Sequence, residues 1–178
     1  MRPLAWILTL SLLSACGWHL RGVTPLPPEY RVMYLQSQAS NSFNQQLKLQ
    51  LEFNDVVLTA SAEDAPAILR IEPVDIERRT LSVSSSGQVG EFELNGRLTA
   101  HILHIGRDTD VEIELKARRT LTNDVNNVVG TASAESQQRA ELERELVNKL
   151  LRRLQSLGKG NQSAATTQSA PAATGTQP

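Results

Sequence analysis

Residues that could carry out catalysis are sparse in this chain of 178 residues. Two of its three histidines, His101 and His104, are three positions apart in a predicted strand. Their side chains therefore point to opposite faces and cannot bind one metal ion together. No serine occupies a Gly-x-Ser-x-Gly motif, and no glycine-rich phosphate loop is present. We therefore expect neither a bound metal nor a cofactor.

Paired carboxylates are the remaining candidates for acid–base chemistry. Glu91 and Glu93 share one face of a predicted strand, and Glu112 and Glu114 share a face of the next. Two neighbouring carboxylates can act as general acid and base. Glutamates that alternate with apolar residues are far more often the solvated face of a sheet. The sequence thus gives no support for an enzyme.

A set of basic side chains offers different chemistry. It comprises Arg78, Arg79, Arg97, Lys116, Arg118 and Arg119. Lysine and arginine donate charge-assisted hydrogen bonds to anionic groups such as lipid phosphates. Neighbouring glutamates favour a simpler interpretation, in which these residues only keep the surface soluble. We predict that the set lies on the polar face of the sheet, and both interpretations of its role remain open.

Strands with one apolar face position most of these residues. The longest is predicted around Phe92 to Ile102, where apolar residues keep one parity, and the next covers Val111 to Ala117. Residues 84–88 and 106–108 read as turns, and a change of phase near Pro73 suggests a bulge or an edge. Further strands are predicted at 30–35, 56–58, 68–77 and 80–84.

One amphipathic helix is predicted after Ser40. Its apolar stripe at helical spacing consists of Phe43, Leu47 and Leu51. Ser40 to Ser42 offer N-caps, Ser42 with Gln45 fits a capping box, and Asn54 can end the helix in the left-handed conformation. Residues 47–53 also alternate as a strand would. We favour a helix because the polar residues between them are helix-tolerant and not β-branched.

A second helix is predicted near the C-terminus. Ser133 can cap it, Glu135 lies in its first turn, and Gly158 ends it. Its apolar stripe includes Leu142, Leu146, Leu150, Leu154 and Leu157. Two helices and several one-sided strands predict an α/β (α+β) two-layer sandwich. Its sheet should be mostly antiparallel or mixed, with about four to five strands, and covered on one face by the two helices.

The N-terminus reads as a secretory leader of residues 1–15. Arg2 precedes an apolar run of ten residues, Leu4 to Leu13, which is too short to span a bilayer. Small residues then precede Cys16, and the order Leu-Ser-Ala-Cys resembles the bacterial lipobox. That resemblance implies cleavage before Cys16, an S-linked diacylglycerol and an N-linked palmitoyl chain. An ordinary signal peptide with a chance cysteine is the alternative.

Cysteine usage agrees with a lipid anchor. Cys16 is the only cysteine, so no internal disulfide is possible. Acylation would remove a thiol that is a liability in an oxidising compartment. Several acyl chains would hold the chain on a membrane almost permanently, because one chain alone binds only marginally. Gly17 stands where aspartate would signal retention in the inner membrane, which points to the periplasmic side of the outer membrane.

The mature chain is expected to form one domain, residues 16–158. Removal of Arg2 leaves 17 basic against 19 acidic residues, a balance that does not favour nucleic-acid binding. Residues 159–178 are small and polar, with no aromatic and no large aliphatic side chain. Such a composition cannot bury enough surface to offset its ordering entropy, so we predict a disordered tail.

The residues after the cysteine carry a specific resemblance. The run Cys16-Gly17-Trp18-His19-Leu20-Arg21 is similar to the start of mature members of the lipopolysaccharide-assembly lipoprotein (LptE) family. Supporting features include Ser86-Gly87-Gln88 before the long strand, the turn at 106–108 and the C-terminal helix. The resemblance implies an α/β sandwich that plugs the outer-membrane β-barrel LptD, helps it to fold, binds lipopolysaccharide and takes part in its transport to the outer leaflet.

Two expectations follow for particular residues. Trp18, His19, Leu20 and Arg21 combine apolar area with polar heads, which suits either a membrane interface or packing against protein. The resemblance implies the second, an ordered lead-in or partner contact. Family members bind lipopolysaccharide through basic residues before the long strand and before the last helix, but residues 84–87 and 130–134 have none. The basic set named above is the substitute. The alternative function is a free-standing lipid- or glycolipid-binding lipoprotein.

Overall fold

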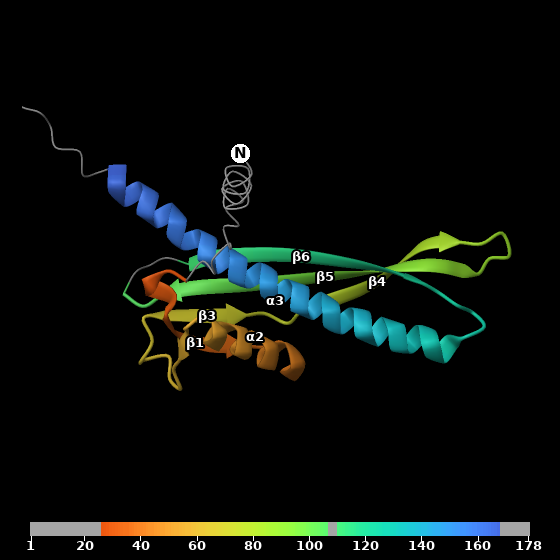
Figure 1. Cartoon of the computed structure of the whole chain (residues 1–178), viewed down its shortest axis with the longest axis horizontal. Helices are drawn as coiled ribbons and strands as arrows, with labels where there is room; N and C mark the ends of the chain where they lie inside the picture. Colours follow the sequence, from red (N-terminus) through yellow and green to blue (C-terminus); the bar gives the residue numbers. More distant parts are fainter. Residues whose placement is uncertain (1–25, 107–109, 168–178) are drawn as a thin grey trace, which may run out of the picture.

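Residues 26–106 and 110–167 are described by the computed structural model of the chain, in which two helices lie along a long, twisted sheet (Figure 1). In chain order the elements are η1 (Pro28–Tyr30), β1 (Val32–Ser37), α2 (Asn41–Phe53), β2 (Val57–Leu58), β3 (Ala67–Ile71), β4 (Asp75–Val83), β5 (Val89–His104), β6 (Asp110–Thr122) and α3 (Val128–Thr167).

Strand β5 organises the sheet. β6 pairs antiparallel with one edge of β5 from Glu91 to Leu103. β3 and β4 share its other edge end to end, and both are antiparallel to it. β1 lies parallel to β3, and the short β2 lies parallel to β1. The predicted mixed two-layer α+β fold is confirmed, but the described residues form a sheet of six strands rather than the four to five expected.

The phase change near Pro73 is the junction of β3 and β4. Ile71 lies opposite Ala100, whereas Asp75 lies opposite Arg97. Three residues on the β3–β4 side therefore face two on β5, so the register shifts by one. One extra residue in an antiparallel pair is a bulge, as the sequence predicted. The shift lets a single long strand pair with two shorter ones.

Helix α2 confirms the helical interpretation of its segment and corrects its ends. The N-cap is Ser40, whose Oγ accepts a hydrogen bond from the Phe43 N–H at 3.2 Å. Ser42 lies inside the helix, so the predicted capping box is wrong. Asn54 has a φ of −97°, and the positive φ of 60° belongs to Asp55. The left-handed residue is therefore one position later than predicted.

The cap gives a direct test. We expect Ser40→Ala to lower the free energy of unfolding by about 1 kcal/mol, because the Phe43 N–H loses its acceptor. Ser42→Ala should cost less than about 0.5 kcal/mol, since that hydroxyl makes only exposed contacts, including one to Glu143 Oε2 at 2.9 Å. Urea unfolding of both variants measures the difference. Equal losses would contradict the assignment of Ser40 as the cap.

Helix α3 is longer at both ends than predicted. It begins at Val128, where the Asn127 Oδ1 accepts from the Gly130 N–H at 2.9 Å in the manner of an N-cap. Ser133 therefore lies inside the helix. The helix also continues past Gly158 to Thr167. Gly158 and Gly160 each cost the helix only about 1 kcal/mol, and no proline follows before Pro171.

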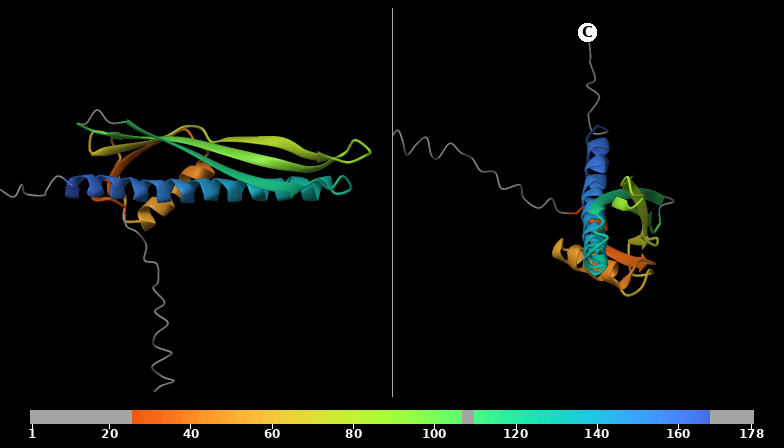
Figure 2. Two further views of the ribbon diagram at one scale, coloured as in Figure 1. Left: turned by 90° about the horizontal axis from the view of Figure 1, so that it is seen from above. Right: turned by 90° about the vertical axis from the view of Figure 1, so that its right-hand side faces the viewer.

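The core lies between the sheet and the two helices. α3 runs along β5 and β6, and α2 lies beside it over β1 and β3 (Figure 2). The fully buried side chains include Phe43, Leu47, Leu51, Phe92, Leu94, Leu98, Ile102, Leu142, Leu146, Leu150 and Leu154. The opposite face of the sheet carries no helix in the part of the chain that is described. None of the described helices has the length and apolar character needed to cross a bilayer.

Candidate functional site

The uncovered face of β4, β5 and β6 contains a hollow, which we call the open-face groove. Its volume is about 490 Å³. Pairing across the strands brings its charged residues together: Arg97 lies between Asp75 and Lys116, while Asn95 lies between Glu77 and Arg118. The lining residues are Asp75, Glu77, Arg78, Arg79, Asn95, Gly96, Arg97, Lys116, Ala117 and Arg118. Five of these residues are basic and two are acidic, and four of the basic ones, all but Arg78, belong to the open face.

Four basic side chains of the predicted set lie on this face because of strand alternation. They are Arg79, Arg97, Lys116 and Arg118. Arg97 and Lys116 are about three-fifths exposed, and both contact Glu114 Oε1, at 3.6 Å and 3.0 Å respectively. Arg118 has no ion-pair partner among the residues that the structure describes. The groove thus offers accessible positive charge from adjacent strands.

Glu114 partly neutralises this cluster. The hydrogen bond and the charge of Lys116 hold the pKa of the Glu114 carboxyl below its usual value, with a smaller contribution from Arg97. Glu114 therefore remains negative at neutral pH and competes with an incoming anion for two cations. An anionic ligand would have to replace these exposed ion pairs, which are individually weak.

Arg78 contradicts the prediction that the whole set lies on the polar face. It lies opposite Leu94, whose side chain is fully buried on the helix-covered face. Its Nη1 contacts Glu135 Oε2 of α3 at 3.3 Å. Its guanidinium carbon lies 3.9 Å from the centroid of the Phe92 ring. A cation–π contact and an ion pair to the helix give Arg78 a structural role.

Arg119 is likewise on the covered face rather than with Lys116 and Arg118. Its Nη1 lies 2.7 Å from Glu145 Oε2 of α3. Lys149 contacts the other oxygen of Glu145 at 2.9 Å and donates to the Lys116 carbonyl oxygen at 2.6 Å. The prediction was wrong because Arg119 occupies an inward-facing position of β6. The inward-facing positions before it hold small or aliphatic residues, so a basic residue breaks the apolar–polar pattern there. Arg119 therefore fastens α3 to β6.

The Glu145 cluster makes stability depend on pH. The Lys149 hydrogen bond chiefly lowers the pKa of Glu145, with help from the charges of Lys149 and Arg119, although burial opposes them. A lowered folded-state pKa stabilises the fold above the usual glutamate value and loses that effect as pH falls below it. We expect Glu145→Gln to reduce the free energy of unfolding by up to about 1 kcal/mol at pH 7.

Urea unfolding from pH 7 to pH 3 checks this expectation. The gap between Glu145→Gln and the unmodified chain should close as the pH falls, because protonation removes the same charge from the unmodified chain. Glu141→Gln is a suitable control, since Glu141 pairs with Arg144 of its own helix and does not join the helix to the sheet. A gap that stays constant with pH would contradict the interpretation.

The two histidines have different surroundings. On the open face, His101 Nδ1 lies 3.2 Å from Asp110 Oδ1, and its Nε2 lies 3.6 Å from Glu72 Oε1. His104 packs against the ring of Tyr30, with centroids 5.5 Å apart. Within residues 26–106 and 110–167, no three metal-ligating side chains are grouped closely enough to hold an ion. His101 is thus a polar surface residue in an acidic setting.

A second hollow, which we call the inter-helix groove, lies between α2 and α3. Its volume is about 210 Å³, and its lining consists of Gln46, Leu49, Gln50, Arg144, Val147 and Asn148. Sequence reasoning missed this site. The available signal was the alternation of residues 47–53, in which Leu49 and Phe53 fall outside the helical stripe. Both side chains are exposed on helix α2.

The predicted residues nearest the N-terminus lie outside the described residues. They are Cys16, Trp18, His19, Leu20 and Arg21. The described chain starts at Leu26, which is buried in the core with only 2% of its surface exposed. The segment that follows Cys16 therefore meets the domain at a fixed point.

Comparison with known sequences gives consistent matches. The family model LptE, described as lipopolysaccharide-assembly, matches residues 26–154. The LPS-assembly lipoprotein LptE of Yersinia enterocolitica is 30% identical over 159 residues, which are 84% of this chain and 76% of the relative. Its counterpart in Pectobacterium atrosepticum is 29% identical over 104 residues, and that match spans 57% of this chain but only 56% of the relative.

Solved structures share the fold. A solution structure of an uncharacterized lipoprotein B from Nitrosomonas europaea has a TM-score of 0.67 at 26% identity, covering 80% of this chain and 93% of the other. The crystal structure of rare lipoprotein B from Shewanella oneidensis has a TM-score of 0.63 at 20% identity, with 72% and 98% covered. At that identity the second match shows the fold alone.

Proposed function

Because the chain belongs to the LptE family of lipopolysaccharide-assembly proteins, we propose that it is an outer-membrane lipoprotein that assists the β-barrel LptD in transporting lipopolysaccharide to the outer leaflet. The family is one of assembly proteins and not of enzymes, as the lack of catalytic motifs in the sequence predicted. The matched region covers most of the described domain, from Leu26 to Leu154. The partner, the anchor and the ligand are the parts of this proposal that need experiments.

The ligand is proposed to be the phosphorylated part of lipopolysaccharide, bound in the open-face groove. The observation that carries this step is the gathering of Arg79, Arg97, Lys116 and Arg118 from three adjacent strands around one hollow. Phosphate oxygens accept charge-assisted hydrogen bonds from such side chains. Arg78 and Arg119 are excluded from the proposed binding residues, because each lies on the covered face and pairs with a glutamate of α3. Arg79 is kept because it lies on the open face, where it pairs with Glu93 at 3.3 Å.

A charge-reversal variant tests the ligand. We expect Arg97→Glu, Lys116→Glu and Arg118→Glu together to raise the Kd for lipopolysaccharide about 100-fold. Loss of two charge-assisted hydrogen bonds, at about 1.5 kcal/mol each, is sufficient for that change. Binding can be measured by titrating the purified protein with fluorescent lipopolysaccharide at fixed ionic strength. The salt concentration must be stated, since exposed charges are screened.

The chain offers a matched control for net charge. Lys48, Arg152 and Arg153 are exposed on the helices, away from the open-face groove, and no ion pair is recorded for them within the described chain. Reversing these three gives the same change in net charge and should leave Kd within about threefold of the unmodified value. Equal losses in both triple variants would show bulk electrostatics and refute the groove. Circular dichroism verifies that both variants fold.

The alternative is a free-standing lipid carrier. A carrier needs an apolar cavity for acyl chains, whereas the space between helices and sheet is filled by side chains with no exposed surface. The two hollows described above are lined mainly by polar residues. These observations favour an assembly partner. Mild extraction of tagged protein from outer membranes should then yield one large β-barrel at equal stoichiometry, and elution with lipid alone would support the carrier.

The anchor is proposed to be Cys16, with an S-linked diacylglycerol and an N-linked palmitoyl chain. Residues Trp18 to Arg21 are proposed to connect it to the domain as an ordered lead-in. The burial of Leu26 in the core supports this proposal, because only nine residues then separate the core from Cys16. Mass spectrometry of the membrane-extracted protein tests the acylation, and Cys16→Ala should release the chain from the membrane.

A further inference from the structure

The inter-helix groove has an occupant within the same chain. We propose that residues 18–25, the segment immediately before the described domain, bind along the groove between α2 and α3 and cover Leu49 and Phe53. The inference is independent of the proposed transport function, because it concerns contacts within one chain.

The first observation is apolar surface with nothing over it among the described residues. Leu49 is 58% exposed and Phe53 is 76% exposed. Leu49 lines the groove, and Phe53, four positions later on the same face of α2, extends the apolar strip by one turn beyond the lining. Scattered apolar residues need no explanation, but this strip, which starts in the groove, offers a site for one or two apolar side chains.

The second observation is the polar character of the lining, which suits a peptide better than an acyl chain. Four of the six lining residues carry hydrogen-bonding groups: Gln46, Gln50, Arg144 and Asn148. Gln50, Arg144 and Asn148 are exposed, so their hydrogen-bonding groups are accessible to a peptide in the groove. A peptide can supply N–H donors together with apolar side chains, whereas an acyl chain cannot.

The third observation is where the described chain begins. The Arg31 carbonyl oxygen accepts a hydrogen bond of 2.7 Å from the N–H of Val57, four residues after Phe53. The start of the domain therefore lies beside the C-terminal end of α2, and Figure 1 shows the first coloured residues at that end of the helix pair. Eight residues can extend about 26 Å, and a helix of 13 residues is about 20 Å long. Residues 18–25 can thus reach the whole groove.

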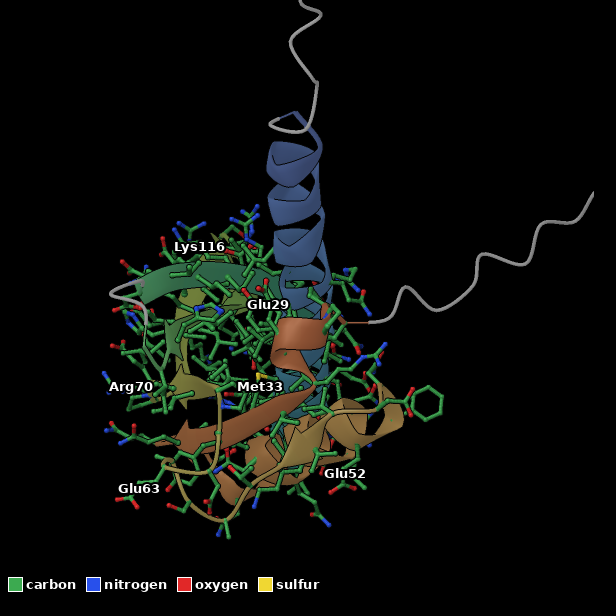
Figure 3. The ribbon with its side chains drawn as sticks, turned by 90° about the vertical axis from the view of Figure 1, so that its left-hand side faces the viewer. Glu29, Met33, Glu52, Glu63, Arg70 and Lys116 are labelled. Atoms are coloured by element: carbon green, nitrogen blue, oxygen red, sulfur yellow. The ribbon has the colours of Figure 1, made fainter. Side chains whose placement is uncertain are left out.

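The composition of the segment complements this surface. Trp18 and Leu20 supply apolar area that can cover the exposed side chains of Leu49 and Phe53. The last turn of α2 contains no basic residue, although a helix C-terminus favours positive charge. Arg21 can supply that charge. Glu52, which is exposed in this last turn and lies far from Lys116 in Figure 3, provides a carboxylate for it.

Photo-cross-linking in native membranes tests the proposal. A benzophenone amino acid replaces Phe53, the cells are irradiated, and the tagged chain is digested with trypsin. We expect the peptide from Leu49 to Arg70 to be joined to a tryptic peptide ending at Arg21 or Arg31 of the same chain, with fragmentation placing the link within residues 18–25. The same amino acid at Val129, which is 79% exposed at the opposite end of the molecule, should give no such product.

A second variant makes the result specific. Trp18→Ser with Leu20→Ser should reduce the cross-link from position 53 at least fivefold, because the segment loses its apolar contacts. A cross-link from position 53 to another protein or to lipid, or a yield unaffected by these changes, would overturn the proposal. The outcome is distinguishable from failure of the proposed transport role, because neither lipopolysaccharide binding nor co-purification of a barrel enters the readout.

Discussion

Gly96→Ala is expected to lower the free energy of unfolding by about 1–3 kcal/mol, although it adds only one methyl group. Gly96 lies on the helix-covered face of β5, between buried Leu94 and Leu98. A Cβ atom there would be 2.1 Å from Leu142 Cδ2 and 3.1 Å from its Cγ. Leu142 is itself fully buried, so α3 would have to move away from the sheet.

The cause of that loss can be isolated by a double variant. Leu142→Ala alone creates a cavity and should cost about 2–5 kcal/mol. In the double variant the alanine methyl occupies part of that cavity, so the combined loss should be clearly smaller than the sum. Gly90→Ala is a control on the same strand, because its Cβ would meet the flexible Ser82 hydroxyl at 3.1 Å and the Ser82 carbonyl oxygen at an ordinary 4.0 Å. Additive losses would contradict the close approach at Gly96.

Phe43→Ala should have the largest effect of any substitution considered, a loss of about 3–5 kcal/mol. Phe43 is in the first turn of α2 and has no exposed surface. Its ring is part of the core shared by α2, α3 and the sheet. Truncation would leave a cavity where the two helices meet. Most single domains are stable by only 5–15 kcal/mol, so the variant should be close to unfolding at growth temperature.

Thermal and urea unfolding of Phe43→Ala and Phe43→Leu measure this effect. The leucine variant keeps most of the apolar volume and should lose clearly less. Both variants should unfold in one transition, because α2 and α3 share a single core. A separate early transition in Phe43→Ala would show that α2 melts independently, and would contradict that cooperativity.

Features that depend on the periodicity of apolar residues could be predicted from the sequence. Features that depend on contacts with residues distant in the chain could not. The apolar parity of β5 and the stripe of α2 follow from residue spacing alone, and both are confirmed. The ends of α3 depend on Asn127 and on a glycine that the helix tolerates, which simple stop signals do not describe. The same distinction applies to the residues of the candidate site.

Arg79, Arg97, Lys116 and Arg118 obey the alternation of their strands, so their common face could be predicted. The covered-face positions of Arg78 and Arg119 follow from the same alternation, because each is next to a residue of the open face. Their ion pairs could not be predicted, because these depend on glutamates of α3 that come many residues later in the chain. The inter-helix groove was missed for a related reason. Its two walls are α2 and α3, which are separated in the sequence by the whole sheet.

The position of α3 at the C-terminal end of the domain has a consequence for biogenesis. α3 covers most of the apolar faces of β5 and β6, so a chain that stops after Thr122 lacks the main element that buries them. Closure of the core must therefore wait for the last element to be delivered. A chain that crosses a membrane from its N-terminus, as the predicted leader requires, would remain unfolded and threadable until almost all of it had been translocated. For a chain exported through the leader that the sequence predicts, this order of elements would delay folding until export is nearly complete.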